Sequence, residues 1–490
     1  MSARRVPTAG ARGWPGRGGG QAVVLDPPPM WRGTSVQVCG LHPFAVGAGT
    51  PAVGVPLGRT LTTGSTLCCD PISWFQRAHL ISNPSAFVLG RPGLGKSTVL
   101  RRWALGLAGF GVLPMVLGDL KPDHVKLGRA IGAQVIELGN GRGFLNVLDP
   151  GEARAAAEKL TGDRRRAILA DAHGRRRTMV AALLTIARGA PPSDREESVI
   201  DAALRELDDN LGHVPVLADL LAVIKTAPES VRSAAVDRGN LDKYLEVTEH
   251  LEASLYGLVH GGRLGEMFSQ PTSEPIRRDK PVVFDISGID EGETDLQAAA
   301  LLACWSTGFA SVAISQVLAD AGLEPRRHRF VVLDELWRVL RSGRGMVDRV
   351  DAITRLNRTV GVGQVMASHT MSDLTALPDE ADRMKAKGFV ERAGMVVCGG
   401  LPPSEVELLR GVIDMSDAEE KLLAGWQDPP AWDSRTGAEA APPGRGHFLV
   451  KVGGRPGIPF VLQLTDAERA VNDTNERWHE QSRISAGVSL

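Results

Sequence analysis

The chain has 490 residues, enough to bury a full core and, from its length alone, to form two to four domain-sized pieces. Its formal net charge is −1, so no overall charge indicates a nucleic-acid or membrane partner. The five cysteines show neither a CxxC pair nor a zinc-like histidine spacing, which predicts reduced thiols in a reducing compartment and argues against a metal site built on them.

Residues 1–50 are rich in Gly, Pro and Arg and have little periodicity, which predicts a disordered N-terminal segment. Arg4 and Arg5 are followed by Gly- and Pro-rich sequence instead of an apolar stretch, so we expect no export signal. Short apolar runs between Val53 and Leu67 predict small strands that lead into the first part of the core, over residues 51–150.

An apolar strand, Ala86 to Leu89, runs directly into a phosphate-loop sequence of the form G-x-x-x-x-G-K-[ST]. Glycines let backbone N–H groups surround a triphosphate, the lysine reaches the β- and γ-phosphates, and the serine hydroxyl completes a Mg²⁺ shell. The pattern therefore predicts a nucleotide site. Its residues are Gly90, Arg91, Pro92, Gly93, Leu94, Gly95, Lys96, Ser97 and Thr98.

Strands and helices alternate after this loop. We expect a helix over 96–110, a strand over 114–117 that ends at Asp119, a helix over 125–131 and a strand over 134–138. This alternation predicts an α/β fold with a mostly parallel sheet.

Helical periodicity dominates from 151 to 255, and residues 193–196 form a capping box before an apolar helix face. We expect an all-helical insertion in the sheet domain. The arginine runs 164–166 and 175–177 fall within it, and their pattern favours solvated helix faces or salt bridges over a binding patch.

The sheet resumes in a second part of the core, residues 256–468, with strands expected at 281–286, 329–333, 363–368 and 395–398 and a closing hairpin at 447–464. The uncharged segment 297–319 imitates a membrane span but carries Ser306, Ser311 and Ser315. It is therefore expected to be a buried crossover helix, and we expect no transmembrane segment. Residues 469–490 are expected to form a C-terminal tail.

A second apolar strand ends in the acids Asp334 and Glu335, at the carboxyl edge where α/β proteins bind ligands. Asp334 can hold Mg²⁺ through water, and Glu335 can polarise a water for attack on the γ-phosphate. An apolar run that ends in Asp-Glu is common at strand ends, but its pairing with a phosphate loop favours a hydrolytic motor. No N/T-K-x-D guanine-binding segment is present, which leaves ATP as the expected nucleotide.

Three further side chains are candidates for catalysis. His369 follows the strand 365–368 and can sense the γ-phosphate, with a satisfied surface histidine as the alternative. Arg355 and Arg358 can reach the phosphate of a neighbouring subunit, because a guanidinium offers forked charge to the transition state. They lie three residues apart on a helix expected to start near Met346, so both can face one subunit boundary.

Together these motifs resemble the type IV secretion and conjugation ATPases, the TraC-like or VirB-four class within the HerA–FtsK superfamily of P-loop motors. The resemblance spans roughly residues 55 to 465. It rests on segments 90–98, 118–123, 143–149, 265–268, 283–286, 333–337, 354–373 and 444–449. The family usually has Gln where this chain has His369, and Pro where it has Val147.

The resemblance implies a RecA-like motor core that hydrolyses ATP with Mg²⁺ and closes into a homo-hexamer with the arginine finger lent in trans. It implies a cytoplasmic protein whose partners are type IV secretion channel components or a coupling protein. Direct DNA binding and peripheral membrane association stay open. Two alternatives also stay open: a HerA- or FtsK-like translocase that acts on duplex DNA, and a non-hydrolysing scaffold that binds ATP only to set ring geometry.

Overall fold

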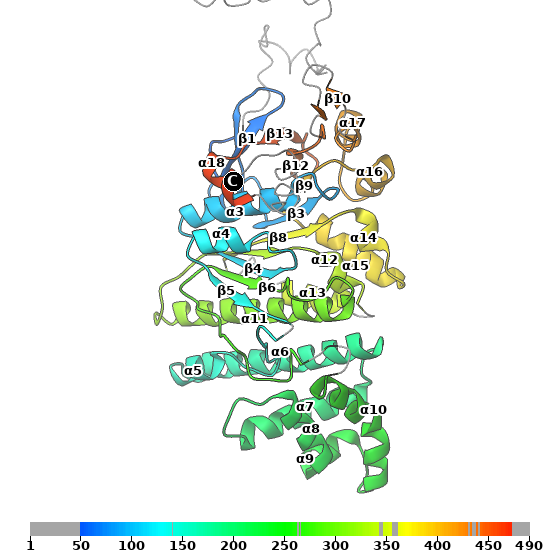
Figure 1. Ribbon diagram of the computed structural model, residues 1–490. Helices are drawn as coiled ribbons and strands as arrows, with labels where there is room; N and C mark the ends of the chain where they lie inside the picture. Colours follow the sequence, from blue (N-terminus) through cyan, green and yellow to red (C-terminus); the bar gives the residue numbers. More distant parts are fainter. Residues whose placement is uncertain are drawn as a thin grey trace, which may run out of the picture. The chain divides into compact units, whose positions relative to one another are not determined.

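The computed structural model describes residues 50–472, apart from 140, 262–263, 265, 343–345, 355–360, 430–431, 434–437 and 440–441. The expectations for residues 1–49 and 473–490 lie outside this range. The described residues contain an eleven-stranded sheet (Figure 1). Its strands in spatial order are β2 (Thr66–Cys68), β1 (Pro56–Thr60), β13 (Ile458–Leu462), β12 (His447–Lys451), β9 (Met395–Cys398), β3 (Ser85–Leu89), β8 (Val362–Ser368), β7 (Arg329–Leu333), β4 (Leu113–Asp119), β6 (Val282–Asp285) and β5 (Gln134–Glu137).

Every neighbouring pair from β9 to β5 is parallel, and every pair from β2 to β9 is antiparallel. The predicted α/β fold with a mostly parallel sheet is therefore confirmed, as is the closing hairpin of β12 and β13. A separate two-stranded ladder joins β10 (Trp432–Asp433) and β11 (Ala438–Glu439).

The parallel strands are buried on both faces because helices cover each side. In β3, Phe87 and Leu89 point into a first core on one face of the sheet, whereas Ala86 and Val88 point into a second core on the other face. The second core contacts α2 (Pro71–Gln76), α3 (Lys96–Gly109) and α4 (Val125–Ala130). The first core contacts α11 (Thr294–Asp320), α12 (Leu336–Leu340) and α14 (Met371–Thr375).

Helix α11 is the crossover helix that the uncharged segment predicts. It lies between β4 and α6 (Gly162–Arg188), so apolar side chains are needed all round it (Figure 1). Within the described ranges it is also the one helix long and apolar enough to cross a membrane, and 83% of its most apolar window is buried in the protein. Gly308 permits the close approach to β4, because a Cβ there would lie 2.5 Å from Leu117.

The segment expected to be helical contains α5 (Ala153–Glu158), α6, α7 (Asp194–Asn210), α8 (Leu217–Thr226), α9 (Glu229–Ala235) and α10 (Leu241–Val259). The predicted capping box is confirmed: Glu196 N–H donates to Ser193 Oγ at 3.3 Å, and Ser193 N–H donates to Glu196 Oε2 at 2.7 Å. The division of the chain into domains stays a prediction.

The remaining helices are α13 (Met346–Thr354), α15 (Glu380–Glu391), α16 (Pro403–Arg410), α17 (Asp417–Gly425) and α18 (Asp466–Asn472). Helix α13 begins where the sequence predicts a helix. The short helices α12 and α14 follow β7 and β8 directly, and the sequence analysis did not identify them.

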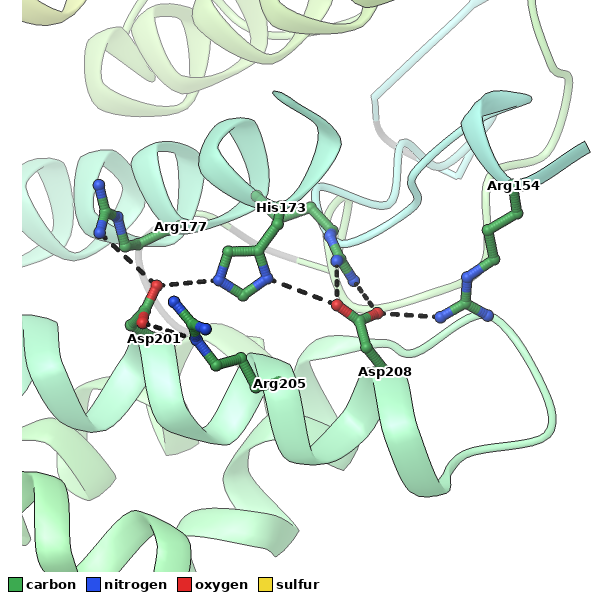
Figure 2. A network of polar contacts seen from close by, with 7 residues as sticks. Arg154, His173, Arg177, Asp201, Arg205 and Asp208 are labelled. Atoms are coloured by element: carbon green, nitrogen blue, oxygen red, sulfur yellow. Dashed lines mark hydrogen bonds and ion pairs between the residues drawn. The ribbon is translucent and has the colours of Figure 1, made fainter. Parts of the chain in front are cut away.

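A network of polar side chains joins α6 to α7 in the helical segment (Figure 2). His173 lies between Asp201 and Asp208, with its Nε2 2.9 Å from Asp201 Oδ1 and its Nδ1 3.4 Å from Asp208 Oδ2. Arg176 donates to Asp208 at 2.8 Å, and Arg177 lies 3.5 Å from Asp201. Ion pairing is therefore confirmed for this arginine run. Arg154 and Arg205 complete the network.

This network should make the helical segment less stable at alkaline pH. The hydrogen bond to Asp208 raises the pKa of His173, and contacts with Asp201 add to that effect, while burial and Arg176 oppose it. Because the folded-state pKa lies above the unfolded value of about 6.5, the stabilisation is present below that pH and is lost as the pH rises through the folded pKa. We expect the melting temperature of the wild type to fall from about pH 6 to about pH 9 more steeply than that of His173→Gln.

The matched control is His213→Gln, because His213 is exposed and lies 3.3 Å from Asp219 at the surface. This variant should keep the pH dependence of the wild type. If the melting temperatures of the wild type and His173→Gln change by the same amount over this pH range, His173 does not cause the pH dependence.

Candidate nucleotide-binding site

The phosphate loop connects β3 to α3, as the sequence predicts. Its glycines occupy positions where a residue with a Cβ would be strained or too close to a neighbouring segment. Gly93 and Gly95 have φ values of 82° and 104°, in the left-handed region that other residues rarely adopt. A Cβ on Gly90 would lie 3.2 Å from the Cα of Gly399. The loop is thereby pressed against the end of β9.

Lys96 is buried at the first position of α3, with 8% of the residue exposed. Its Nζ donates to the carbonyl oxygen of Gly90 at 2.6 Å, so the ammonium group lies inside the loop. Burial lowers the pKa of Lys96, and the nearby carboxylates of Asp334, Glu335 and Asp373 oppose that effect. Lys96 is therefore a cation held in the loop at the site where a phosphate charge would need neutralising.

The sheet brings Asp334 and Glu335 to the same edge as the phosphate loop. Strand β8 lies between β3 and β7, and all three run parallel, so their carboxyl ends meet. Burial raises the pKa of Asp334 to about 6, Glu335 adds to the rise, and Lys96 opposes it. The backbone N–H of Glu335 donates to Asp334 Oδ1 at 2.9 Å. The two acids thus form a compact pair within the electrostatic reach of Lys96.

His369 also lies at this edge, rather than at a distant surface position. Its Nε2 is 3.4 Å from Glu335 Oε1, and its carbonyl oxygen accepts the N–H of Gly90 at 3.1 Å. Burial lowers the pKa of His369, and the nearby carboxylate of Glu335 opposes that effect. Its Nδ1 and the Oγ of the neighbouring Ser368 are buried without a hydrogen-bond partner among the described residues.

The sequence analysis missed the contacts that hold the outer side of the phosphate loop. Arg91 N–H donates to the carbonyl oxygen of Gly400 at 3.1 Å, and Gly446 N–H donates to that of Leu94 at 3.0 Å. The Arg91 side chain donates to Gln427 at 3.3 Å. The available signal was the Gly-Gly pair, 399–400, directly after an apolar strand.

The other predicted site residues are distributed as follows. Ser97 and Thr98 lie in the first turn of α3 and are partly exposed, and Pro92 is exposed. Arg355 and Arg358 lie outside the described residues, so the structure does not place them. Within the described ranges, no group of three His, Cys, Asp or Glu side chains could by itself hold a metal ion.

Comparison with known proteins gave matches among solved structures. A scan against protein-family models found no match, and a search of curated proteins found none either. VirB4 of Thermoanaerobacter pseudethanolicus is 17% identical, with a TM-score of 0.63 over 85% of this chain and 98% of that one. The plasmid coupling protein TrwB in complex with ADP and Mg²⁺ is 13% identical, with a TM-score of 0.48 over 78% of this chain and 86% of that one. The chain thus has the fold of VirB4, and the predicted resemblance to the VirB-four class is confirmed at the level of the fold.

Proposed function

We propose that the chain is an ATP-hydrolysing motor that energises conjugative DNA transfer or type IV secretion. The observation that carries the proposal is the meeting of Lys96, Asp334 and Glu335 at one edge of a mostly parallel sheet. A cation in a phosphate loop opposite two acids is the arrangement that phosphoryl transfer to water requires. The fold shared with VirB4 supports this choice among P-loop proteins.

The residues present suit a nucleoside triphosphate with Mg²⁺. Because the loop glycines have no Cβ, the backbone of the loop can approach phosphate groups closely. The unpartnered polar atoms of Ser368 and His369 lie at the same edge. Ser97 and Asp334 would hold Mg²⁺. When bound, the ion would neutralise charge on the β- and γ-phosphates.

Each side chain then has a distinct task. Lys96 neutralises charge on the transferring phosphoryl group, and its burial strengthens that interaction. Glu335 orients the attacking water and accepts its proton. His369 lies at the same edge with its Nδ1 unpartnered, and we assign it the sensing of the γ-phosphate.

We further infer that the motor is a homo-hexamer in which Arg355 or Arg358 serves the neighbouring subunit. An Ala variant of the acting arginine should be inactive alone but should regain partial activity when mixed with Lys96→Ala subunits. Some interfaces of such a mixed ring pair an intact phosphate loop with an intact arginine. Steady-state ATP hydrolysis across subunit ratios, after co-assembly has been verified, measures this. If activity never exceeds the sum of the two separate variants, the trans role is wrong.

We place the motor in the cytoplasm, acting with secretion channel components or a coupling protein. A transfer assay tests this role in cells that depend on the chain. Wild type should restore transfer, and Lys96→Ala, expressed at the same level, should not. Full transfer with Lys96→Ala would show that ATP hydrolysis by this chain does not energise transfer.

A further inference from the structure

The carboxylate of Glu335 has a side-chain neighbour at each of its oxygens. Trp337 Nε1 donates to Oε2 at 2.5 Å, and His369 Nε2 lies 3.4 Å from Oε1. The Glu335 backbone is left-handed, with φ 54° and ψ 36°, which is strained for a residue with a side chain. An indole offers one donor in a fixed direction, so it determines which way the carboxylate faces.

The Trp337 ring is itself held by two guanidinium groups. The Cζ of Arg338 lies 4.9 Å from the ring centroid and that of Arg341 lies 5.1 Å from it, which are cation–π distances. Arg338 also donates to Gln297 on α11 at 2.5 Å. The indole is therefore linked through Arg338 to the crossover helix.

Arg341 connects the same ring to the segment that follows β8. Its Nη2 lies 3.2 Å from Asp373 Oδ1, and Asp373 Oδ2 accepts the N–H of Thr370 at 3.2 Å. Thr370 directly follows His369, whose ring centroid lies 6.3 Å from that of Trp337. A continuous chain of contacts thus runs from Glu335 through Trp337 and Arg341 to the segment that carries His369.

We propose that Trp337 is a positioning residue for hydrolysis, which orients the Glu335 carboxylate, and that Arg341 couples this orientation to residues 369–373. The inference rests on the proposed function, because Glu335 must act on water for its orientation to matter. Trp337 itself acts through Glu335 and needs no contact with the nucleotide.

The first test is Trp337→Phe, which keeps an aromatic ring for the guanidinium contacts and removes the indole N–H. We expect kcat for ATP hydrolysis to fall on the order of tenfold to a hundredfold, since a small misplacement of a reacting group has an effect of this size. Nucleotide affinity should be unchanged. The matched control is Trp74→Phe, which removes an indole donor to the carbonyls of Val53 and Cys68 on the other face of the sheet and should keep kcat.

A double-mutant cycle separates positioning from a general structural role. In single-turnover measurements, Glu335→Gln/Trp337→Phe should be no slower than Glu335→Gln alone, because the indole has no carboxylate left to orient. Arg341→Ala provides a second route should Trp337→Phe fold poorly, since the Arg341 side chain is 35% exposed. It should also lower kcat in the wild type and have no effect in the Glu335→Gln background.

Two results would overturn the inference: a wild-type kcat in Trp337→Phe and Arg341→Ala, or a rate loss that persists in full in the Glu335→Gln background. Neither result would contradict the proposed function, as long as the wild type hydrolyses ATP and Lys96→Ala does not. A wild type without hydrolysis would instead contradict the proposed function.

Discussion

Lys96→Ala should reduce ATP hydrolysis by a factor on the order of 10²–10³. Lys96 is buried inside the phosphate loop, with its Nζ 2.6 Å from the carbonyl oxygen of Gly90. A cation with little access to water stabilises developing phosphate charge far more than an exposed one, so its removal should affect the rate more than the fold. Phosphate release under saturating ATP and Mg²⁺ measures the effect.

Lys280→Ala is the control for this variant, because Lys280 is an exposed lysine just before β6, and its loss should leave the rate unchanged. Circular dichroism and melting temperature check that Lys96→Ala is folded. A folded Lys96→Ala protein with near wild-type turnover would remove the basis for assigning the phosphate loop to catalysis.

Glu335→Gln should bind ATP and assemble as the wild type does, but its turnover should fall by a factor on the order of 10²–10⁴, the usual contribution of a general base. The amide keeps the size of the side chain, and its carbonyl oxygen can still accept the hydrogen bond from Trp337. What it loses is the capacity to take a proton from water. Nucleotide affinity and hydrolysis rate, measured on the same preparation, separate the two effects.

Glu137→Gln is a matched control, since Glu137 is an exposed acid that ends β5, the strand at the edge of the sheet. It should hydrolyse ATP at the wild-type rate. If Glu335→Gln fails to bind nucleotide, Glu335 is a structural residue and the assignment of the base is wrong.

The local pattern of the sequence predicted the core of the fold well. Strands such as Met395–Cys398 are short apolar runs between turn residues, and the phosphate loop has a spacing that chemistry dictates. The strand order was not predictable, because β8 lies between β3 and β7 although it follows both in sequence. That placement depends on how whole layers pack, and no single residue encodes it.

The site was predicted as a set of residue types but not as a set of contacts. Asp334 and Glu335 could be identified because two acids follow an apolar strand. The link from Arg341 to Asp373 joins residues 32 positions apart and appears only when α12 and α14 pack together. The hydrogen bond from Trp337 to Glu335 is local, but it depends on the left-handed backbone of Glu335. Short helices such as these carry too few residues for a periodic signal.

The fate of bound nucleotide tests the central claim most directly. The wild-type protein is loaded with radiolabelled ATP, hydrolysis is started with Mg²⁺, and samples are quenched in acid and separated, with Glu335→Gln treated in parallel. We predict that the wild type converts bound ATP to ADP and phosphate while Glu335→Gln retains intact ATP. ATP that stays intact on the folded wild-type protein in the presence of Mg²⁺ would contradict the account.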